Sequence, residues 1–147
     1  MTLLSRGADY AIRAMLDVAS LPEDKITITQ QIAMRQDIPV AFLSKVIAQL
    51  TQAGLLRTYR GAAGGVHLGK PAEEINLRQV VEALQGPVAL NLCTDPHDGC
   101  PKAATCPADR VFREAQKNLD TLLGQAILSH LAREATMLKA NEQSRSR

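Results

Sequence analysis

The sequence contains no tryptophan and only two phenylalanines and two tyrosines, so its hydrophobic core must be built mainly from aliphatic side chains. It also lacks an apolar run long enough to span a membrane or to serve as the hydrophobic region of a signal peptide. We therefore expect a cytoplasmic protein without a membrane partner. A hydrophobic content of 46% over 147 residues is sufficient for one compact domain with an appended element.

Cysteine is scarce, and the three that occur all lie between Cys93 and Cys106. An odd number of cysteines in a chain expected to be cytoplasmic argues against a disulfide framework and favours metal or redox chemistry. The chain has no C-x-x-C pair and no strand–helix pattern typical of a nucleotide-binding fold. These two absences argue against a thiol oxidoreductase, and no enzymatic activity is expected.

Acidic residues are missing from one long stretch, between Ile38 and Ala72, which holds the basic residues Lys45, Arg57, Arg60 and Lys70. The net charge of +2 is uninformative by itself, but its distribution is uneven. Residues 1–70 contain eight Lys/Arg against five Asp/Glu, whereas residues 71–147 contain nine against ten. A local surplus of positive charge favours a phosphate backbone as the partner.

Residues 27–71 have the pattern of a winged helix. Thr29 can cap a short helix, which the polar residues 34–37 would interrupt. Pro39 suits the first turn of a second helix, and Gly54 would end it. Between them, apolar residues recur every three or four positions, at Phe42, Leu43, Val46, Ile47 and Leu50. Two helices joined by a tight turn are the helix-turn-helix signature.

Two short strands, residues 55–59 and 66–68, are expected on either side of the glycine-rich run RGAAGG at 60–65. This hairpin would be the wing. Arg60 stands next to glycines whose small size lets a backbone and a guanidinium group approach a narrow minor groove. The alternative interpretation is an ordinary hairpin whose glycines serve only its turn geometry.

We expect the DNA-contacting surface to combine both helices with the wing, because residues near the start of a recognition helix touch base edges. Phe42 could belong to the core or contact a thymine methyl group, and Gln30 could contact phosphate or simply be solvated. The candidate DNA-binding residues are Gln30, Pro39, Val40, Ala41, Phe42, Ser44, Lys45, Arg57, Arg60, Gly61 and Gly65. A winged helix used only for protein contacts is the rival, and the acid-free basic stretch argues against it.

The remaining helices complete a mainly α fold. An amphipathic helix is expected from about Ser5 to residue 20, and another over residues 77–84, capped by Asn76 and ended by Gly86. A single long helix is expected over residues 108–141, roughly 50 Å long at 1.5 Å per residue. Because a domain of this size cannot cover such a helix, we expect its apolar stripe to pack against a second copy.

The predicted organisation is a winged helix-turn-helix with a small β-hairpin wing and a long C-terminal dimerisation helix. Residues 1–86 form the DNA-binding domain, 87–107 a cysteine loop, 108–141 the dimerisation helix and 142–147 a disordered tail.

The cysteine loop is the candidate cofactor site. Cys93, Cys100 and Cys106 are separated by six and five residues, too far apart for a C-x-x-C knuckle. Thiolates on a flexible loop can nevertheless wrap an iron–sulfur cluster, and three of them leave one iron in need of another ligand. The nearby candidates for that ligand are Asp95, His97, Asp98 and Asp109. A zinc site completed by His97, or three incidental thiols, are the alternatives.

These features together resemble the Rrf-type winged-helix regulators, a group that includes the iron–sulfur cluster regulator IscR and the nitric-oxide-responsive repressor NsrR. The resemblance is carried by residues 7–17 (GADYAIRAMLD), by the wing at 54–70 and by the cysteine loop. It implies a homodimeric transcriptional regulator that crosses its long helices on a palindromic operator in double-stranded DNA. Each subunit would hold an iron–sulfur cluster, either 2Fe–2S or 4Fe–4S, on Cys93, Cys100 and Cys106.

The chain departs from its relatives at the cluster. Its first cysteine gap is six residues, where five is common, and Asp109 stands where IscR-like proteins have a histidine. NsrR-like proteins take an aspartate from the first helix of the partner, which corresponds to Asp9. Asp109 has another reason to be present, because a carboxylate is favoured in the first turn of a helix. We expect Asp9 on an otherwise apolar helix face, where a half-buried charge needs a partner, and therefore favour Asp9 of the partner subunit.

Control of DNA binding would follow from the position of the loop, which lies between the helix at 77–84 and the long helix. Ordering or freeing the loop can change the spacing of the two DNA-binding domains. A metal-free thiol switch at the same cysteines is the rival mechanism.

Overall fold

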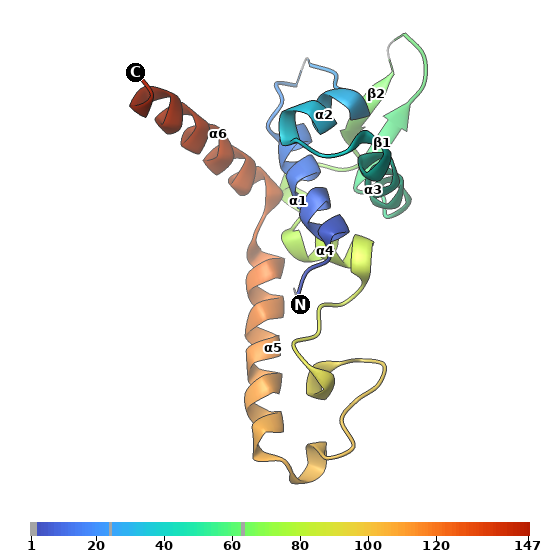
Figure 1. Cartoon of the computed structure of the whole chain (residues 1–147), viewed down its shortest axis with the longest axis vertical. Helices are drawn as coiled ribbons and strands as arrows, with labels where there is room; N and C mark the ends of the chain where they lie inside the picture. Colours follow the sequence, from blue (N-terminus) through green and yellow to red (C-terminus); the bar gives the residue numbers. More distant parts are fainter. Residues whose placement is uncertain (1–2, 24, 63) are drawn as a thin grey trace.

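A computed structural model describes residues 3–23, 25–62 and 64–147 (Figure 1). Within these ranges the fold is mainly helical with one antiparallel hairpin, as predicted. The principal elements are α1 (Arg6–Ala19), α2 (Thr29–Gln36), α3 (Val40–Gln52), β1 (Leu56–Tyr59), β2 (Gly65–Leu68), α4 (Leu77–Gln85), α5 (Pro107–Gln125) and α6 (Leu128–Arg145). Three short 3₁₀ turns, η1 (Ala72–Glu74), η2 (Leu92–Thr94) and η3 (Ala103–Thr105), lie in the connections.

Helix α1 lies at the centre of the N-terminal domain and packs against α2, α3, α4, β2 and α6 (Figure 1). The hydroxyl of Ser5 accepts a hydrogen bond from the Ala8 N–H at 3.0 Å and so caps the helix at the residue predicted for its start. The inward face of α1 is buried and mainly apolar, and its apolar residues are Ala8, Ala11, Ala14, Met15 and Val18. The core is therefore aliphatic, as the scarcity of aromatic residues predicts.

The helix-turn-helix is formed by α2 and α3. The predicted polar break at 34–37 is confined to Asp37, whose φ of 52° places it in the left-handed region, while α2 continues to Gln36. Helix α2 also begins differently from the prediction, because Thr29 is its first residue and Ile28 is the cap. At the far end of α3, Gly54 follows the last turn with a φ of 79°, a conformation that favours glycine.

The hairpin pairs Leu56 with Leu68 and Tyr59 with Gly65, within one residue of the predicted strands. Gly65 is buried, and a Cβ atom added there would lie 2.6 Å from the carbonyl oxygen of Thr27 and collide with Ile26. Gly65 therefore lets β2 pack closely against the segment before α2. Ala63, within the predicted wing tip, lies outside the described residues.

Helix α4 agrees with its prediction. Asn76 and Gln79 form a reciprocal capping box, in which each side chain accepts a hydrogen bond of 2.9 Å from the other's backbone N–H. Gly86 ends the helix with a φ of 75°.

The predicted continuous helix over 108–141 is wrong, because the structure divides it into α5 and α6 at Ala126 and Ile127. The N–H of Leu77 donates to the Ala126 carbonyl at 3.0 Å, and the N–H of Leu128 donates to the Ile75 carbonyl at 2.8 Å. Backbone pairing with the start of α4 thus replaces the helical hydrogen bonds at this point. The interruption buries Leu128 completely.

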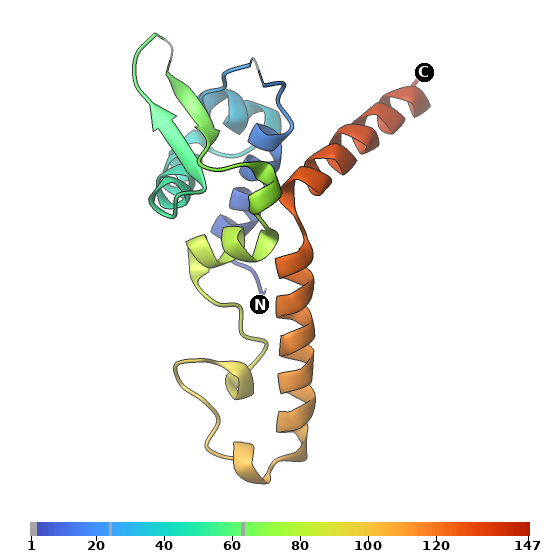
Figure 2. The same ribbon diagram turned by 180° about the vertical axis from the view of Figure 1, so that it is seen from behind.

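The two C-terminal helices leave the N-terminal domain in different directions (Figure 2). Helix α5 runs beside the cysteine loop, and α6 projects outward from the side of the domain (Figures 1 and 2). The predicted disordered tail at 142–147 is also wrong for most of its length, because α6 extends to Arg145. Among the described helices, none has both the length and the apolar character needed to cross a membrane.

Candidate nucleic-acid interface and cysteine site

Helix α3 has one buried and one exposed face. Its buried face consists of Leu43, Val46, Ile47 and Leu50. The residues predicted to contact DNA lie on the opposite side, where Pro39, Val40, Ala41, Phe42, Ser44 and Lys45 are all exposed. Gln30 on α2 is exposed as well. The structure therefore leaves the predicted reading face open to solvent.

Phe42 was predicted either to belong to the core or to contact DNA, and its surroundings combine features of both. Its side chain is 40% exposed, yet its ring packs edge-on against Tyr10 of α1, with 5.2 Å between ring centroids. The guanidinium group of Arg13 lies over the Tyr10 ring at 4.8 Å and donates a hydrogen bond of 2.9 Å to the Gln36 carbonyl. Helix α1 thus braces both the end of α2 and the first turn of α3.

The wing exposes two of its basic residues. Arg57 and Arg60 are exposed, and the side chain of neither forms an ion pair or a hydrogen bond within the part of the chain that the structure describes. Gly61 is also exposed, with a φ of 100° that favours glycine. Gly65 differs from the other predicted DNA-binding residues, because it is buried against Thr27 and cannot form part of an exposed surface.

The three cysteines lie on the loop that leads into α5 and at the start of that helix. Cys93 lies in η2, Cys100 in the following loop, and Cys106 caps α5; all three are half-buried and unpaired. The pKa of Cys93 is raised by burial, by the charge of Cys100 and a hydrogen bond with it, and by the charges of Asp109 and Cys106. That these cysteines bind one cofactor stays a prediction.

The cysteine loop is fastened to α5 by one side chain. Gln116 donates to the Val88 carbonyl at 2.7 Å and accepts from the Leu90 N–H at 2.9 Å. Further along, the Asp95 carboxylate accepts hydrogen bonds from the backbone of His97 at 2.8 Å and Asp98 at 3.3 Å, which lowers the pKa of Asp95. Asp95 is therefore engaged in the turn, and the His97 side chain is exposed.

The burial argument for Asp9 is wrong. Its side chain is 62% exposed and forms an ion pair with Arg13 at 3.3 Å, so it needs no second partner within the chain. Asp109 is the more buried carboxylate, with 15% of its side chain exposed. Its Oδ2 accepts a hydrogen bond from Arg113 at 2.7 Å, while its Oδ1 is buried and has no hydrogen-bond partner among the described residues.

The donor types on the cysteine loop and in the first turn of α5 fit an iron–sulfur group, because three free thiols occur together with a buried carboxylate oxygen, Asp109 Oδ1, that has no partner among the described residues. No group of three or more His, Cys, Asp or Glu side chains within the described ranges is arranged so that it could hold a single metal ion. The residues therefore fit an iron–sulfur group by the type of donor atoms they offer.

Sequence reasoning missed a polar cluster behind the helix-turn-helix. Asp17 of α1 is only 5% exposed and is paired with Arg35 of α2, which also binds Thr27. A charged residue on the inward face of an amphipathic helix was the available signal, because such a group is seldom buried without a partner.

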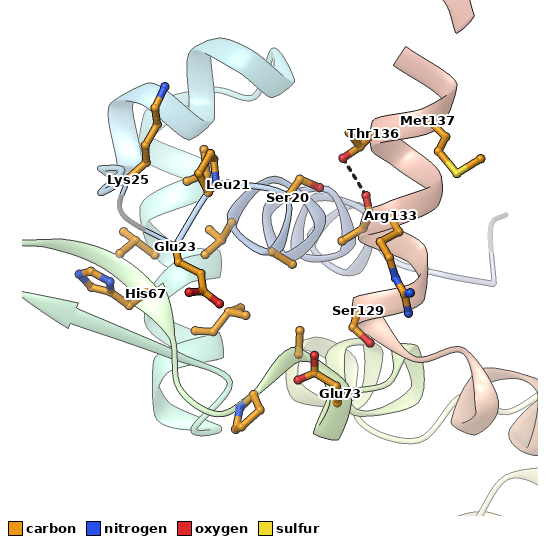
Figure 3. Close-up of a pocket in the computed structure, with 18 residues that line it drawn as sticks. Ser20, Leu21, Glu23, Lys25, His67, Glu73, Ser129, Arg133, Thr136 and Met137 are labelled. Carbon is orange, nitrogen blue, oxygen red and sulfur yellow. Dashed lines mark hydrogen bonds between the residues drawn. The ribbon is translucent and has the colours of Figure 1, made fainter. Parts of the chain in front are cut away.

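A cavity of about 1080 Å³ lies between the loop after α1, strand β2, η1 and α6. Figure 3 shows Glu23, Lys25 and His67 on its wing side and Ser129, Arg133 and Met137 on α6. None of the three cysteines and none of the predicted DNA-binding residues lines it. The cavity is thus separate from both candidate sites.

The fold and the exposed basic surface define a winged helix-turn-helix protein with a thiol-bearing loop. The chain matches the family model described as "Rrf2: Iron-dependent Transcriptional regulator" over residues 4–134. It therefore belongs to the Rrf2 family of transcriptional regulators, as its sequence resemblance predicts. It is 33% identical over 138 residues to Protein rrf2 of Nitratidesulfovibrio vulgaris, covering 94% of this chain and 92% of that protein. The family consists of transcriptional regulators, which implies binding to DNA and points away from an enzyme.

Two solved structures share the fold. CymR, described as the global cysteine regulator of B. subtilis, has a TM-score of 0.77 and 24% identity, covering 91% of this chain and 98% of that one. IscR of T. potens has a TM-score of 0.73 and 23% identity, covering 90% of this chain and 87% of that one. The winged-helix architecture is therefore confirmed.

Proposed function

We propose that this protein is a homodimeric transcriptional regulator whose affinity for its operator is controlled by an iron–sulfur cluster held by Cys93, Cys100 and Cys106. One observation carries the proposal: η2, which contains Cys93, packs against α5, whose N-cap is Cys106 and whose Asp109 has a buried Oδ1 without a partner among the described residues. The two segments that carry Cys93 and Cys106 therefore meet the same helix. The description of the family as iron-dependent supports the same interpretation.

Thiolates are the ordinary protein ligands of iron–sulfur clusters, either 2Fe–2S or 4Fe–4S. When bound, such a cluster would supply redox-sensitive bonds between the iron atoms and the three cysteines. Cys93 and Cys106 stand at opposite ends of the loop, so holding both would fix the loop against α5.

We propose Asp109 as the fourth ligand, because its buried Oδ1 has no partner among the described residues while its Oδ2 is held by Arg113. Asp9 of the partner subunit is the alternative, and its 62% exposure leaves it accessible to a second chain. His97 is exposed on the loop but stands in the turn held by Asp95.

Operator binding would use the exposed face of α3 together with the wing. Val40, Ala41 and Ser44 would meet base edges in the major groove, and Lys45 would meet phosphate. Arg60 at the wing would approach the minor groove, because no group of the described chain neutralises its charge. Double-stranded DNA with a palindromic operator would match a two-fold symmetric dimer.

The homodimer would form through α5 and α6. Helix α5 exposes the apolar side chains of Val111, Phe112 and Leu122, to 52%, 40% and 67%. On the projecting part of α6, Met137 and Leu138 are 65% and 68% exposed. Apolar side chains on helices that extend away from the domain favour burial against a second copy.

Coupling between the cysteines and the DNA-binding domain would run through α5. Gln116 binds the loop, and Leu119, one turn further along the same helix, packs against Ala8, Val81 and Val88. Changes in the order of the loop can therefore alter how α5 sits against α1 and α4. In a dimer, that movement would change the spacing of the two α3 helices.

A metal-free thiol switch is the second candidate function. It is favoured by three free, half-buried thiols on one loop, where burial and the neighbouring Cys100 both raise the pKa of Cys93, and by the likeness to a structure described as a cysteine regulator. Hydrogen peroxide would accept two electrons and two protons from two of these thiols, leaving a disulfide and water. A zinc site that includes His97 would also keep the DNA-binding role.

Anaerobic purification followed by visible spectroscopy and assays of iron and acid-labile sulfide tests the proposal. We expect both elements in the wild-type protein and their loss in Cys93→Ser, with Ser5→Ala as a control outside the loop. Wild-type protein without iron and sulfide would contradict the cluster. A Cys93–Cys100 disulfide formed by that protein with peroxide, detected by mass spectrometry, would support the switch.

A further inference from the structure

A buried charge joins α1 to the end of α2. Asp17 of α1 is 5% exposed, and its carboxylate accepts hydrogen bonds from Arg35 Nε at 3.0 Å and from Arg35 Nη2 at 2.6 Å. The side-chain amide of Gln36 donates to the same carboxylate at 3.0 Å. A two-point guanidinium–carboxylate pair fixes direction as well as distance, so the orientation of the Arg35 side chain is determined by α1.

The Arg35 nitrogen that binds Asp17, Nη2, also binds Thr27. It donates to the hydroxyl of Thr27 at 2.7 Å, and that hydroxyl donates in turn to Gln31 Oε1 at 3.3 Å. Thr27 is 2% exposed and precedes α2. Its side chain is therefore held entirely by the helix-turn-helix.

The backbone of Thr27 holds the wing. Its carbonyl oxygen accepts a hydrogen bond from the Val66 N–H of β2 at 2.8 Å, forming an isolated bridge between the two residues. The absence of a side chain at Gly65 permits this approach. Thr27 thus presents its hydroxyl to α2 and its carbonyl to the wing.

We propose that Arg35 is a positioning residue for operator binding, and that it sets the wing relative to α3 through Thr27 without contacting DNA. This inference rests on the proposed role of the wing in binding the operator. Asp17 fixes Arg35, Arg35 fixes the Thr27 side chain, and the Thr27 backbone fixes β2. Arg60, at the end of the hairpin, would magnify any rotation at its base.

Thr27→Val tests the inference with little change in side-chain volume. It removes the hydroxyl that Arg35 binds but keeps the carbonyl that binds Val66. Arg35 is 39% exposed, so water can satisfy the freed N–H. We expect a folded dimer whose operator affinity is about fivefold lower, which corresponds to the typical net contribution of one hydrogen bond. Thr136→Val is the matched control, because among the described residues its hydroxyl binds only the Ala132 carbonyl, within α6.

A double-mutant cycle with Arg60→Ala separates positioning of the wing from a purely structural role. If Thr27 acts through the wing, Thr27→Val should have no further effect on affinity once Arg60 is replaced. Its effect on the midpoint of thermal unfolding should stay the same in both backgrounds. Arg35→Lys should reproduce the pattern, because lysine cannot make the two-point contact, and it replaces Thr27→Val if that variant fails to fold.

Two results would overturn the inference while leaving the proposed function in place, provided that Arg60→Ala itself weakens binding. One is an unchanged affinity of the Thr27→Val protein. The other is an equal loss of affinity from Thr27→Val with and without Arg60. If the Arg60→Ala protein bound the operator as tightly as the wild type, the proposed role of the wing would be wrong. The inference about Arg35 would then fail as well.

Discussion

Asp109 gives one carboxylate oxygen, Oδ2, to Arg113 at 2.7 Å and leaves the other, Oδ1, buried without a hydrogen-bond partner among the described residues. An unsatisfied buried oxygen costs free energy unless something binds it, on the order of 1–3 kcal/mol. Its position in the first turn of α5, three residues after Cys106, makes an iron atom bound by the cysteines a suitable partner. Arg113 would then hold the carboxylate in position.

Asp109→Ala is therefore expected to weaken cluster binding more than Asp9→Ala. Cluster absorbance followed anaerobically over time measures both variants against the wild type. Faster loss in Asp109→Ala alone supports Asp109 as the ligand. If Asp9→Ala loses its absorbance while Asp109→Ala keeps it, Asp9 of the partner subunit is the ligand instead.

The pKa of Cys93 in the metal-free protein is expected to fall when Asp109 is replaced by asparagine. The negative charge of Asp109 disfavours the thiolate and raises this pKa, so its removal should produce more thiolate at a given pH. The measurement is alkylation of Cys93 by iodoacetamide, followed by mass spectrometry from pH 7 to 10. At pH values below the wild-type pKa of Cys93, the Asp109→Asn protein should react faster than the wild type. Asp98→Asn, in the same loop, is the control; equal acceleration in both variants would mean a general loosening of the loop.

Arg60→Ala is expected to weaken operator binding at least about tenfold, because a guanidinium contact with DNA contributes on the order of 1–3 kcal/mol. The mutant should remain dimeric and keep its cluster. Fluorescence anisotropy across a salt series measures the change. Lys139→Ala, which removes the same charge from the exposed end of α6, should bind like the wild type. If Arg60→Ala also bound the operator with wild-type affinity, the wing would be a structural turn without a role in DNA binding.

Glutamate at both Val111 and Leu122 is expected to produce monomers. These side chains are 52% and 67% exposed on α5, so charges there should disrupt a dimer while sparing the fold. Leu119 is a poorer choice, because it packs against the core of its own chain. Sedimentation measures the mass, and circular dichroism checks that the helices persist. A double variant that stays a tight dimer would place the interface elsewhere.

The parts of the fold that local chemistry determines could be predicted from the sequence. Asn76 caps α4, and Gly54 and Gly86 adopt the positive φ that glycine favours at helix ends. The aliphatic repeat of α3 identified its buried face correctly. These features depend on residues within a few positions of one another, so the chain's pattern is enough to indicate them.

Contacts between distant segments could not be predicted in the same way. The helix break at Ala126 arises from pairing with Ile75 and Leu77, and no proline or glycine stands at the break itself. The partner of Asp17 is Arg35 on another helix, so the sequence alone did not reveal it. At the candidate cysteine site, the exposure of Asp9 depends on how α1 packs, which the sequence did not reveal.

The central claim is that the state of the three cysteines controls operator affinity, and one paired measurement tests it directly. An operator duplex is first selected from random DNA, and its affinity is then measured for anaerobically purified protein before and after removal of iron and sulfide. We predict a change of at least about tenfold, within the usual range of coupling between two sites, that disappears when Cys93, Cys100 and Cys106 are all serine. Equal affinities of the loaded and stripped protein would contradict the account.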